Sequence, residues 1–394
     1  IALCAQHCHH VHARVGFEGG PQVSDPRAPE WSQHLAVHEA WWQQIWQSQK
    51  QRSMKVSTLT PEFGPAPYLH LLPYTQAPVA DLADICDWMA RRHGVKFDPA
   101  WVSPTPGIVS GLGLILQAVS APDDEVVVFH PAYHAFRRII RANERRILDA
   151  QLVESAGRYV MDLDALRARL SPQTKVVFLC SPHNPGGTVW SAAELRALGA
   201  LCAERDLILV SDEIHCDLVF AGAKHTPTMA AAPEIADRLI TCVAATKTFN
   251  LAGAHVGACI TSNAALKRRL DARIAASGLG SYNRFGMIAT EAAWRTGVAW
   301  LDELLPYLTK NRDVFDARIE AAATGARSMH LDGTYLAWVD FSGTGLAPED
   351  VAARVRDRAR LFVSPGEQFG PGGETWLRFN FATPRPLLDE ALSR

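Results

Sequence analysis

The feature that most constrains the fold of this chain is an alternation of helical and strand patterns from about residue 80 to residue 263. Three apolar segments in this region, residues 175–180, 207–210 and 239–244, have the length and composition of buried strands. Strands that alternate with helices are typical of a parallel sheet joined by crossover helices. The chain is therefore expected to contain an α/β domain.

Two of the expected helices have clear local signals. Residues 107–119 are apolar nearly all round, which predicts a buried helix. Residues 191–204 are amphipathic, with Ser191 as the expected N-cap and Glu194 three residues later.

A polar residue follows each of the three apolar segments. Asn184 lies in a loop of turn residues after the first, Asp212 ends the second, and Lys247 follows the third. Because ligands of open α/β sheets bind outside the carboxyl ends of the strands, these three side chains are predicted to meet in one site. Each alone has a simpler explanation: a turn asparagine, an acid that caps a loop, and an exposed lysine.

Lys247 is the candidate for covalent chemistry. At the mouth of a buried strand an ammonium group loses hydration, and its pKa falls. A neutral amine can then attack an aldehyde, as a Schiff-base lysine does.

Composition sets the broad class of the protein. A chain of 394 residues usually forms two domains. A net charge of -2 gives no electrostatic reason to expect nucleic acid or an acidic membrane as a partner. Eight scattered cysteines are typical of a reducing compartment, and no apolar run has membrane-spanning length. We expect a soluble cytoplasmic enzyme without a leader segment.

Four segments carry a resemblance to a known family: residues 182–185 (PHNP), 212–215 (DEIH), 247–250 (KTFN) and 369–373 (FGPGG). With them the chain resembles fold-type I enzymes of the class I/II aminotransferase superfamily, which use pyridoxal 5'-phosphate (PLP). Within that superfamily it is similar to the MalY/PatB branch of cystathionine or cysteine-S-conjugate β-lyases. The resemblance implies a mostly parallel seven-stranded sheet, a smaller α+β domain, and a homodimer with sites at the interface.

The resemblance begins near Tyr74 and sets the expected domains. Residues 1–70 are an anomalous N-terminal segment, residues 71–284 a large PLP-binding domain, and residues 285–394 a small C-terminal domain. The pattern changes at about residue 285 to a long helical region, followed by expected strands at 335–340 and 376–380.

The first seventy residues lack the N-terminal arm motif of the family. They carry a group of metal-ligand residue types, namely Cys4, His7, Cys8, His9, His10 and His12. No distant second pair has zinc spacing, so no metal is expected. A translation artefact such as a frameshift or a misplaced start, an unstructured segment, and a lineage-specific extension are the interpretations left open.

The resemblance assigns roles around the cofactor ring. Asp212 would keep the ring nitrogen protonated, because a nearby carboxylate raises the pKa of a pyridinium. Asn184 would donate a hydrogen bond to the phenolic oxygen of the ring, and Tyr133 would stack over it. His215 stands where many aminotransferases have tyrosine. The alternatives are a turn tyrosine for Tyr133 and a surface histidine for His215.

The resemblance also implies a phosphate site and a carboxylate site. Backbone N–H groups at the start of a helix bind anions. The residues implied for the phosphate are Gly107, Ile108, Val109, Thr246 and, from the neighbouring subunit, Tyr74. His255 replaces an arginine that some relatives use there. Arg378, on a strand with alternating aromatic residues, would bind the substrate α-carboxylate in a bidentate manner, with a structural salt bridge as its alternative.

These roles imply a PLP-dependent carbon–sulfur β-lyase. Lys247 would remove the α-proton, and a thiol would leave from Cβ, so that pyruvate and ammonia remain. One alternative is an aminotransferase that uses the same residues. Another is a non-catalytic PLP-fold regulatory protein. His215 and the glycine-rich segment 369–373 favour the lyase.

Overall fold

The computed structural model describes residues 2–8, 10–13, 15, 29–54, 58–61, 84–280, 282–322 and 324–394. The chain divides into two compact units. The first consists of Ile1–Asp81 and Ser281–Arg284, and the second of Leu82–Gly280 and Phe285–Arg394. Tyr74 lies outside the described residues. The domain boundaries expected at residues 71 and 285 stay predictions.

The described part of the first unit contains one long helix and four short elements. Its elements are α1 (Ala2–Ala5), β1 (His10–Ala13), η1 (Pro29–Trp31), α2 (Ser32–Gln51) and β2 (Thr58–Pro61), with β1 parallel to β2. The helix α2 buries only Gln49 among its residues and leaves Trp41 37% exposed. A helix without a buried apolar face gains little from tertiary packing.

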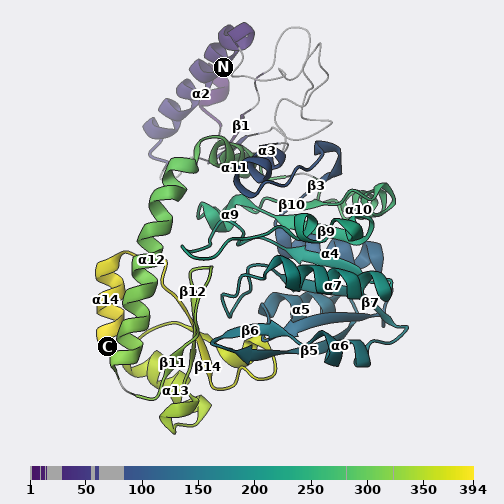
Figure 1. Ribbon diagram of the computed structural model, residues 1–394. Helices are drawn as coiled ribbons and strands as arrows, with labels where there is room; N and C mark the ends of the chain where they lie inside the picture. The colour runs from purple at the N-terminus through teal and green to yellow at the C-terminus, as the bar shows by residue number, and fades with distance from the viewer. Residues whose placement is uncertain are drawn as a thin grey trace. The chain divides into compact units, whose positions relative to one another are not determined.

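The second unit is built on an eight-stranded sheet in the order β3-β10-β9-β8-β7-β4-β5-β6 (Figure 1). The strands are β3 (Val102–Thr105), β4 (Glu125–His130), β5 (Arg146–Ser155), β6 (Arg158–Met161), β7 (Thr174–Cys180), β8 (Ile208–Asp212), β9 (Leu239–Val243) and β10 (Gly257–Ile260). The five neighbours β9, β8, β7, β4 and β5 are parallel, whereas β10 and β6 are antiparallel to their neighbours. The predicted α/β fold with a mostly parallel sheet is confirmed.

The sheet has one strand beyond the seven expected. This strand, β6, forms a hairpin with the second half of β5, in which Ser155 pairs with Arg158. The two connecting residues, Ala156 and Gly157, both have positive φ, 50° and 79°. Two-residue hairpin loops favour this backbone because its twist matches that of the strands. The usual sequence signal for such a loop is Asn-Gly or Asp-Gly. This chain has Ala-Gly, so the hairpin was not predicted from the sequence.

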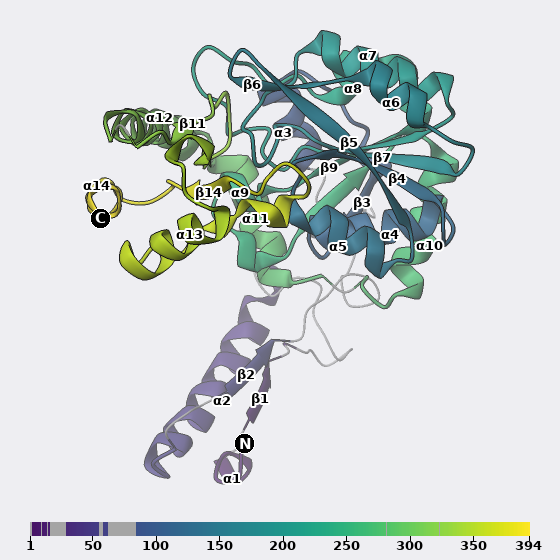
Figure 2. The same ribbon diagram turned by 90° about the horizontal axis from the view of Figure 1, so that it is seen from below.

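Helices cover both faces of the sheet (Figure 2). One face packs against α4 (Ile108–Val119), α5 (His134–Ala142) and α10 (Ala264–Ala276). The other face packs against α6 (Leu163–Arg169), α7 (Ala192–Glu204) and α8 (Thr228–Ala231). The prediction of a buried helix at 107–119 is confirmed, because most residues of α4 are buried.

The C-terminal part forms a second, antiparallel sheet in the order β11-β12-β14-β13. Its strands are β11 (Arg327–Ser328), β12 (Leu336–Asp340), β13 (Ser364–Pro365) and β14 (Trp376–Asn380). The strands predicted at 335–340 and 376–380 are thus confirmed. Leu308 and Phe315 of α12 (Val298–Ala321) and Leu388 of α14 (Arg385–Ser393) share a core with this sheet.

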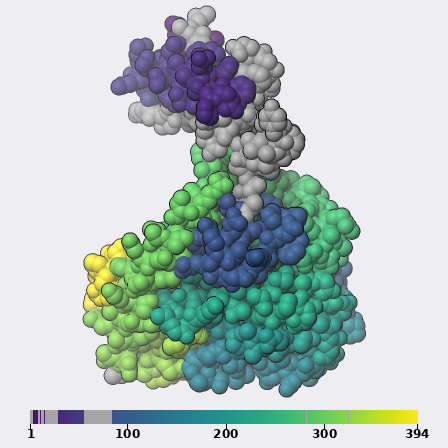
Figure 3. Space-filling view, turned by 45° about the horizontal axis from the view of Figure 1, so that its top comes forward, coloured from purple at the N-terminus to yellow at the C-terminus, as the bar shows by residue number. Residues whose placement is uncertain are grey.

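Shorter segments complete the second unit. They are α3 (Asp84–His93), η2 (Pro99–Trp101), η3 (Pro233–Arg238), α9 (Ala245–Thr248), η4 (Ala252–Ala254), α11 (Arg284–Thr296), η5 (Ser342–Thr344), α13 (Pro348–Ala353), η6 (Arg354–Arg358) and η7 (Gly366–Phe369). In the space-filling view α3, in dark blue, lies against the green part of the chain, which includes α12 (Figure 3). Arg92 of α3 forms an ion pair with Asp302 of α12 at 3.0 Å.

None of the helices in the described part of the chain combines the length and the apolar character that crossing a membrane requires.

The helix α7 begins as the sequence predicts. Ser191 is its N-cap, and the capping box with Glu194 is complete. The Ser191 hydroxyl accepts the Glu194 N–H at 3.2 Å, and the Glu194 carboxylate accepts the Ser191 N–H at 2.8 Å. This box satisfies backbone donors that the first turn otherwise leaves without partners.

We expect Ser191→Ala to lower the free energy of unfolding by about 1 kcal/mol, because one backbone donor of the first turn loses its acceptor. Ser191→Thr, which keeps the hydroxyl, is the matched control. Urea unfolding monitored by circular dichroism measures both. A loss of equal size in the two variants would contradict the capping role.

Candidate active site

A cavity of about 520 Å³ lies at the carboxyl ends of the parallel strands of the second unit. Asn184, Asp212 and Lys247, the three residues predicted to meet from their strand positions, all line it. The other predicted site residues that line it are Tyr133, His215, Gly107, Ile108, Val109, Thr246 and Arg378. Of the site residues expected from the sequence, only Tyr74 lies outside the described residues.

Strand register explains why these side chains converge. Cys180 at the end of β7 pairs with Asp212 at the end of β8, and Asp212 pairs with Cys242 of β9. The Ser181 N–H then donates to the Asp212 carbonyl at 2.9 Å, which holds the loop that carries Asn184 beside β8. Neighbouring parallel strands therefore end side by side and place their following residues around one space.

Asp212 is a buried carboxylate with little support. Only 3% of the residue is exposed. The one hydrogen bond of its side chain among the described residues is from the Ile214 N–H to Oδ1, at 3.2 Å. Burial raises the pKa of Asp212 to about 7, although the Ile214 N–H and the Lys247 ammonium oppose this change. A positively charged partner in the cavity would stabilise the ionised form.

Lys247 lies in the short helix α9, directly after β9. Burial lowers its pKa, and the nearby charge of Arg378 lowers it further, whereas Asp212 acts in the opposite direction. The site therefore favours the neutral amine more than water does. A neutral amine is the form that can attack an aldehyde or accept a proton.

Arg378 reaches the cavity from β14. Its Nη1 donates to Asn184 Oδ1 at 2.9 Å, its Nη2 donates to Ser364 Oγ at 3.1 Å, and its guanidinium lies 4.7 Å from the ring centre of Phe369. Within the part of the chain that the structure describes, it forms no ion pair with a carboxylate. The structural salt bridge considered as its alternative role is therefore not found there, and an anionic ligand would supply the missing charge.

His215 and Tyr133 both line the cavity; His215 is buried and Tyr133 is partly buried. Burial lowers the pKa of His215 to about 3, and the charges of Lys247 and Arg378 add to this, so its imidazole is neutral. Its Nδ1 is buried and has no hydrogen-bond partner among the described residues, and only 3% of the residue is exposed, unlike a surface histidine. Burial is also the main reason that the pKa of Tyr133 is raised.

The start of α4 also lines the cavity. Gly107 has φ of 88° and precedes the first helical residue, Ile108, so the first backbone N–H groups of α4 have no partner within the helix. Thr246 and His255 line the same cavity. Helix starts of this kind bind anions such as phosphate.

Sequence reasoning missed Ser110, His134 and Arg138, which also line the cavity. Ser110 follows the predicted helix start, and Arg138 follows Tyr133 in the next helix. Proximity to predicted site residues was the available signal. Ser364 and Phe369 hold Arg378. Phe369 lies in the family segment 369–373, but its contact with Arg378, like that of Ser364, depends on tertiary packing and could not be predicted from the sequence.

A second buried carboxylate, Asp217, supports the turn that carries Lys247. It accepts hydrogen bonds from Thr248 Oγ1 at 2.8 Å, from Trp88 Nε1 at 3.0 Å and from His93 Nε2 at 2.8 Å. Ligand atoms of His93, Cys216 and Asp217 lie within 4.8 Å of one another, the one such group in the described part of the chain. The three donors already occupy Asp217, which explains the cluster without a metal ion.

Comparison with known proteins defines the class. Residues 48–394 match the family described as Aminotransferase class I and II. The chain therefore belongs to this family.

Particular relatives lie in one branch of the family. Cystathionine beta-lyase PatB of Bacillus subtilis (strain 168) is 38% identical over 311 residues, which cover 79% of this chain and 80% of PatB. Protein MalY of Escherichia coli (strain K12) is 29% identical, with 79% and 80% covered. Cystalysin from Treponema denticola, whose crystal structure contains pyridoxal 5'-phosphate, superposes with a TM-score of 0.76 at 30% identity, with 79% of each chain covered.

The cavity fits this cofactor. PLP carries a ring nitrogen that can be protonated, an aldehyde and a phosphate. The weakly supported carboxylate of Asp212, the amine of Lys247 and the helix start at Gly107 offer one complementary group for each.

The unusual pKa of Asp212 predicts a pH dependence of stability in the cofactor-free protein. Its pKa is raised from 3.8 to about 7, so between these pH values the folded state holds a proton that the unfolded state has lost. The free energy of unfolding should therefore fall as the pH rises through this window. Asp212→Asn should remove this fall, so that its stability relative to the parent increases with pH.

Urea unfolding at about pH 5 and about pH 7.5 measures this difference. Asp164→Asn is the control, because the Asp164 side chain is 94% exposed. Equal pH dependence of the parent and Asp212→Asn would contradict the assignment.

Proposed function

We propose that this chain is a PLP-dependent carbon–sulfur β-lyase that cleaves cystathionine or related cysteine S-conjugates to a thiol, pyruvate and ammonia. The observation that carries the proposal is the meeting of Lys247, Asp212, Asn184 and Arg378 in one cavity. The similarity to cystathionine beta-lyase PatB supports the choice of reaction.

The cofactor, when bound, supplies an electron sink that stabilises negative charge at the substrate Cα. Lys247 would hold its aldehyde carbon, Asp212 its ring nitrogen and Asn184 its ring oxygen, with Tyr133 against the ring. The N–H groups of Gly107, Ile108 and Val109 and the hydroxyl of Thr246 would hold its phosphate. Tyr74 of a second subunit stays a prediction for the phosphate.

The residues of the chain then divide the work on the substrate. Arg378 binds the α-carboxylate and fixes the orientation of Cα, because a planar guanidinium and a carboxylate pair through two parallel hydrogen bonds. The Nζ atom of Lys247 accepts the α-proton, since its lowered pKa makes the neutral form accessible. His215 stays neutral beside it and adds no competing positive charge.

An aminotransferase is the second candidate, because the family is named for that reaction. It would use the same residues up to proton removal and differ only in whether a group leaves Cβ. His215 and the segment at 369–373 favour the lyase. A non-catalytic regulatory protein of the same fold is the third, less favoured candidate.

The assembly and location follow from the same proposal. The partners are a small amino acid substrate and a second copy of the chain, with neither nucleic acid nor membrane involved. The proposed location is the cytoplasm.

The purified protein with PLP should release pyruvate from cystathionine without any added 2-oxo acid. Lys247→Ala should lose both the visible absorbance of the bound cofactor and all turnover, because the amine that holds the cofactor is gone. Lys267→Ala, which removes a lysine paired with Asp271 on α10, is the matched control. Transamination of a common amino acid without pyruvate release would reverse the ranking of lyase and aminotransferase.

A further inference from the structure

The proposed carboxylate site joins two different sheets. Arg378 comes from β14 of the small sheet, whereas Asn184 comes from the loop after β7 of the large sheet, and their side chains meet at 2.9 Å. A bidentate pair with a carboxylate tolerates little displacement of the guanidinium. The contacts that fix the position of one sheet relative to the other therefore determine how well this site can bind a carboxylate.

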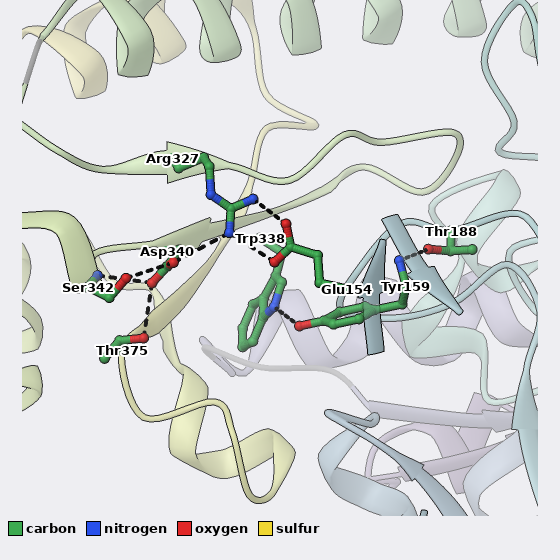
Figure 4. Close-up of polar contacts among 8 residues, drawn as sticks. All are labelled: Glu154, Tyr159, Thr188, Arg327, Trp338, Asp340, Ser342 and Thr375. Atoms are coloured by element: carbon green, nitrogen blue, oxygen red, sulfur yellow. Dashed lines mark hydrogen bonds and ion pairs between the residues drawn. The ribbon is translucent and has the colours of Figure 1, made fainter. Parts of the chain in front are cut away.

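The hairpin strand β6 touches the small sheet through Tyr159. Its hydroxyl accepts a hydrogen bond from Nε1 of Trp338 at 3.1 Å (Figure 4). Trp338 is the register partner of Arg378 between β12 and β14. Its ring also lies 5.2 Å from that of Phe369, and Phe369 lies 4.7 Å from the Arg378 guanidinium. The Tyr159 hydroxyl is thus connected to Arg378 both through strand pairing and through packed rings.

The same tyrosine contacts the loop that carries Asn184. Its backbone N–H donates to Thr188 Oγ1 at 3.3 Å, and its ring lies 5.7 Å from that of His183. A Cβ atom on Gly186 would lie only 2.4 Å from the Tyr159 ring, so the ring packs directly against the loop backbone. Tyr159 therefore contacts Trp338, the strand partner of Arg378, and also the loop that carries Asn184.

A second contact between the same two sheets is exposed. Glu154 of β5 pairs with Arg327 of β11 at 2.7 and 2.9 Å, and Arg327 also approaches Asp340 of β12 at 3.5 Å (Figure 4). The side chains of Arg327 and Glu154 are 46% and 35% exposed. Exposed pairs of this kind contribute little, whereas Tyr159 is only 5% exposed and its loss would leave a buried donor without an acceptor.

We propose that Tyr159 is a positioning residue for the carboxylate site, which it orders by holding β12 and the Asn184 loop together. The inference rests on the proposed role of Arg378. Without the Tyr159 hydroxyl, the Trp338 indole N–H is buried and unpaired. The strand pair that carries Arg378 then loses one of the contacts that hold it in position. Binding of the α-carboxylate should weaken, while the proton transfer at Lys247 is not directly touched.

The test compares ligands with and without a carboxylate on the PLP-loaded protein. The change in visible absorbance on titration measures the affinity for L-alanine and for ethylamine. Tyr159→Phe should weaken L-alanine binding roughly tenfold, because it unpairs one buried donor, and should leave ethylamine binding unchanged. Glu154→Gln is the control, since it weakens the exposed contact between the same two sheets, and it should change neither affinity.

A double-mutant cycle separates positioning from general destabilisation. In an Arg378→Ala background, Tyr159→Phe should have no further effect on L-alanine binding. Trp338→Phe, which removes the same hydrogen bond from the other side, should reproduce the selective loss if Tyr159→Phe does not fold. For substrate turnover, the expected result is a raised KM with little change in kcat.

Two results would overturn the inference. Equal weakening of L-alanine and ethylamine would indicate a merely structural tyrosine, and so would an undiminished effect in the Arg378→Ala background. If Arg378→Ala by itself left L-alanine binding intact, the carboxylate role of Arg378 would be refuted and the inference with it. That outcome is distinguishable from failure of the lyase proposal, which depends on pyruvate release.

Discussion

The structure of the site depends on one costly arrangement, the burial of the Asp212 carboxylate with a single hydrogen bond among the described residues. An ionised carboxylate in such a place loses hydration without adequate replacement, which is why its pKa rises to about 7. A buried group of this kind normally has a partner. The protonated ring nitrogen of PLP would supply that partner, so the same feature that weakens the cofactor-free protein would favour binding of the cofactor.

Asp217 is a nearby carboxylate with a structural role, and its hydrogen bonding differs from that of Asp212. It lies five residues after Asp212 and is also buried, at 4% exposed. Burial alone would raise the pKa of Asp217, but the hydrogen bonds from His93, Thr248 and Trp88 outweigh it and lower the pKa. The three hydrogen bonds of Asp217 stabilise the turn that carries Lys247. The single hydrogen bond of the Asp212 carboxylate leaves acceptor positions for a ligand.

The sequence was informative where local pattern and topology act together. Apolar segments followed by Asn184, Asp212 and Lys247 predict a common site, because parallel neighbours end at the same edge of a sheet. The β6 hairpin was missed because Ala156 has a left-handed backbone conformation, which is not predicted for alanine. Ser364, Phe369 and Tyr159 were missed for another reason: their importance depends on contacts between segments far apart in the sequence. For the N-terminal seventy residues the sequence left several interpretations open, and the family match begins within them, at residue 48.

Distribution of the site over two sheets has a physical consequence for Arg378. Its cation is largely buried and, within the described residues, has no carboxylate partner. Burial lowers its pKa. The Asn184 amide oxygen, the Ser364 hydroxyl and the Phe369 ring stabilise it without neutralising it. In the proposed role of Arg378, a carboxylate from within the chain would compete with the substrate, whereas neutral supports leave the guanidinium available for an external anion. Neutral supports must be held in place by packing such as that around Trp338 and Tyr159.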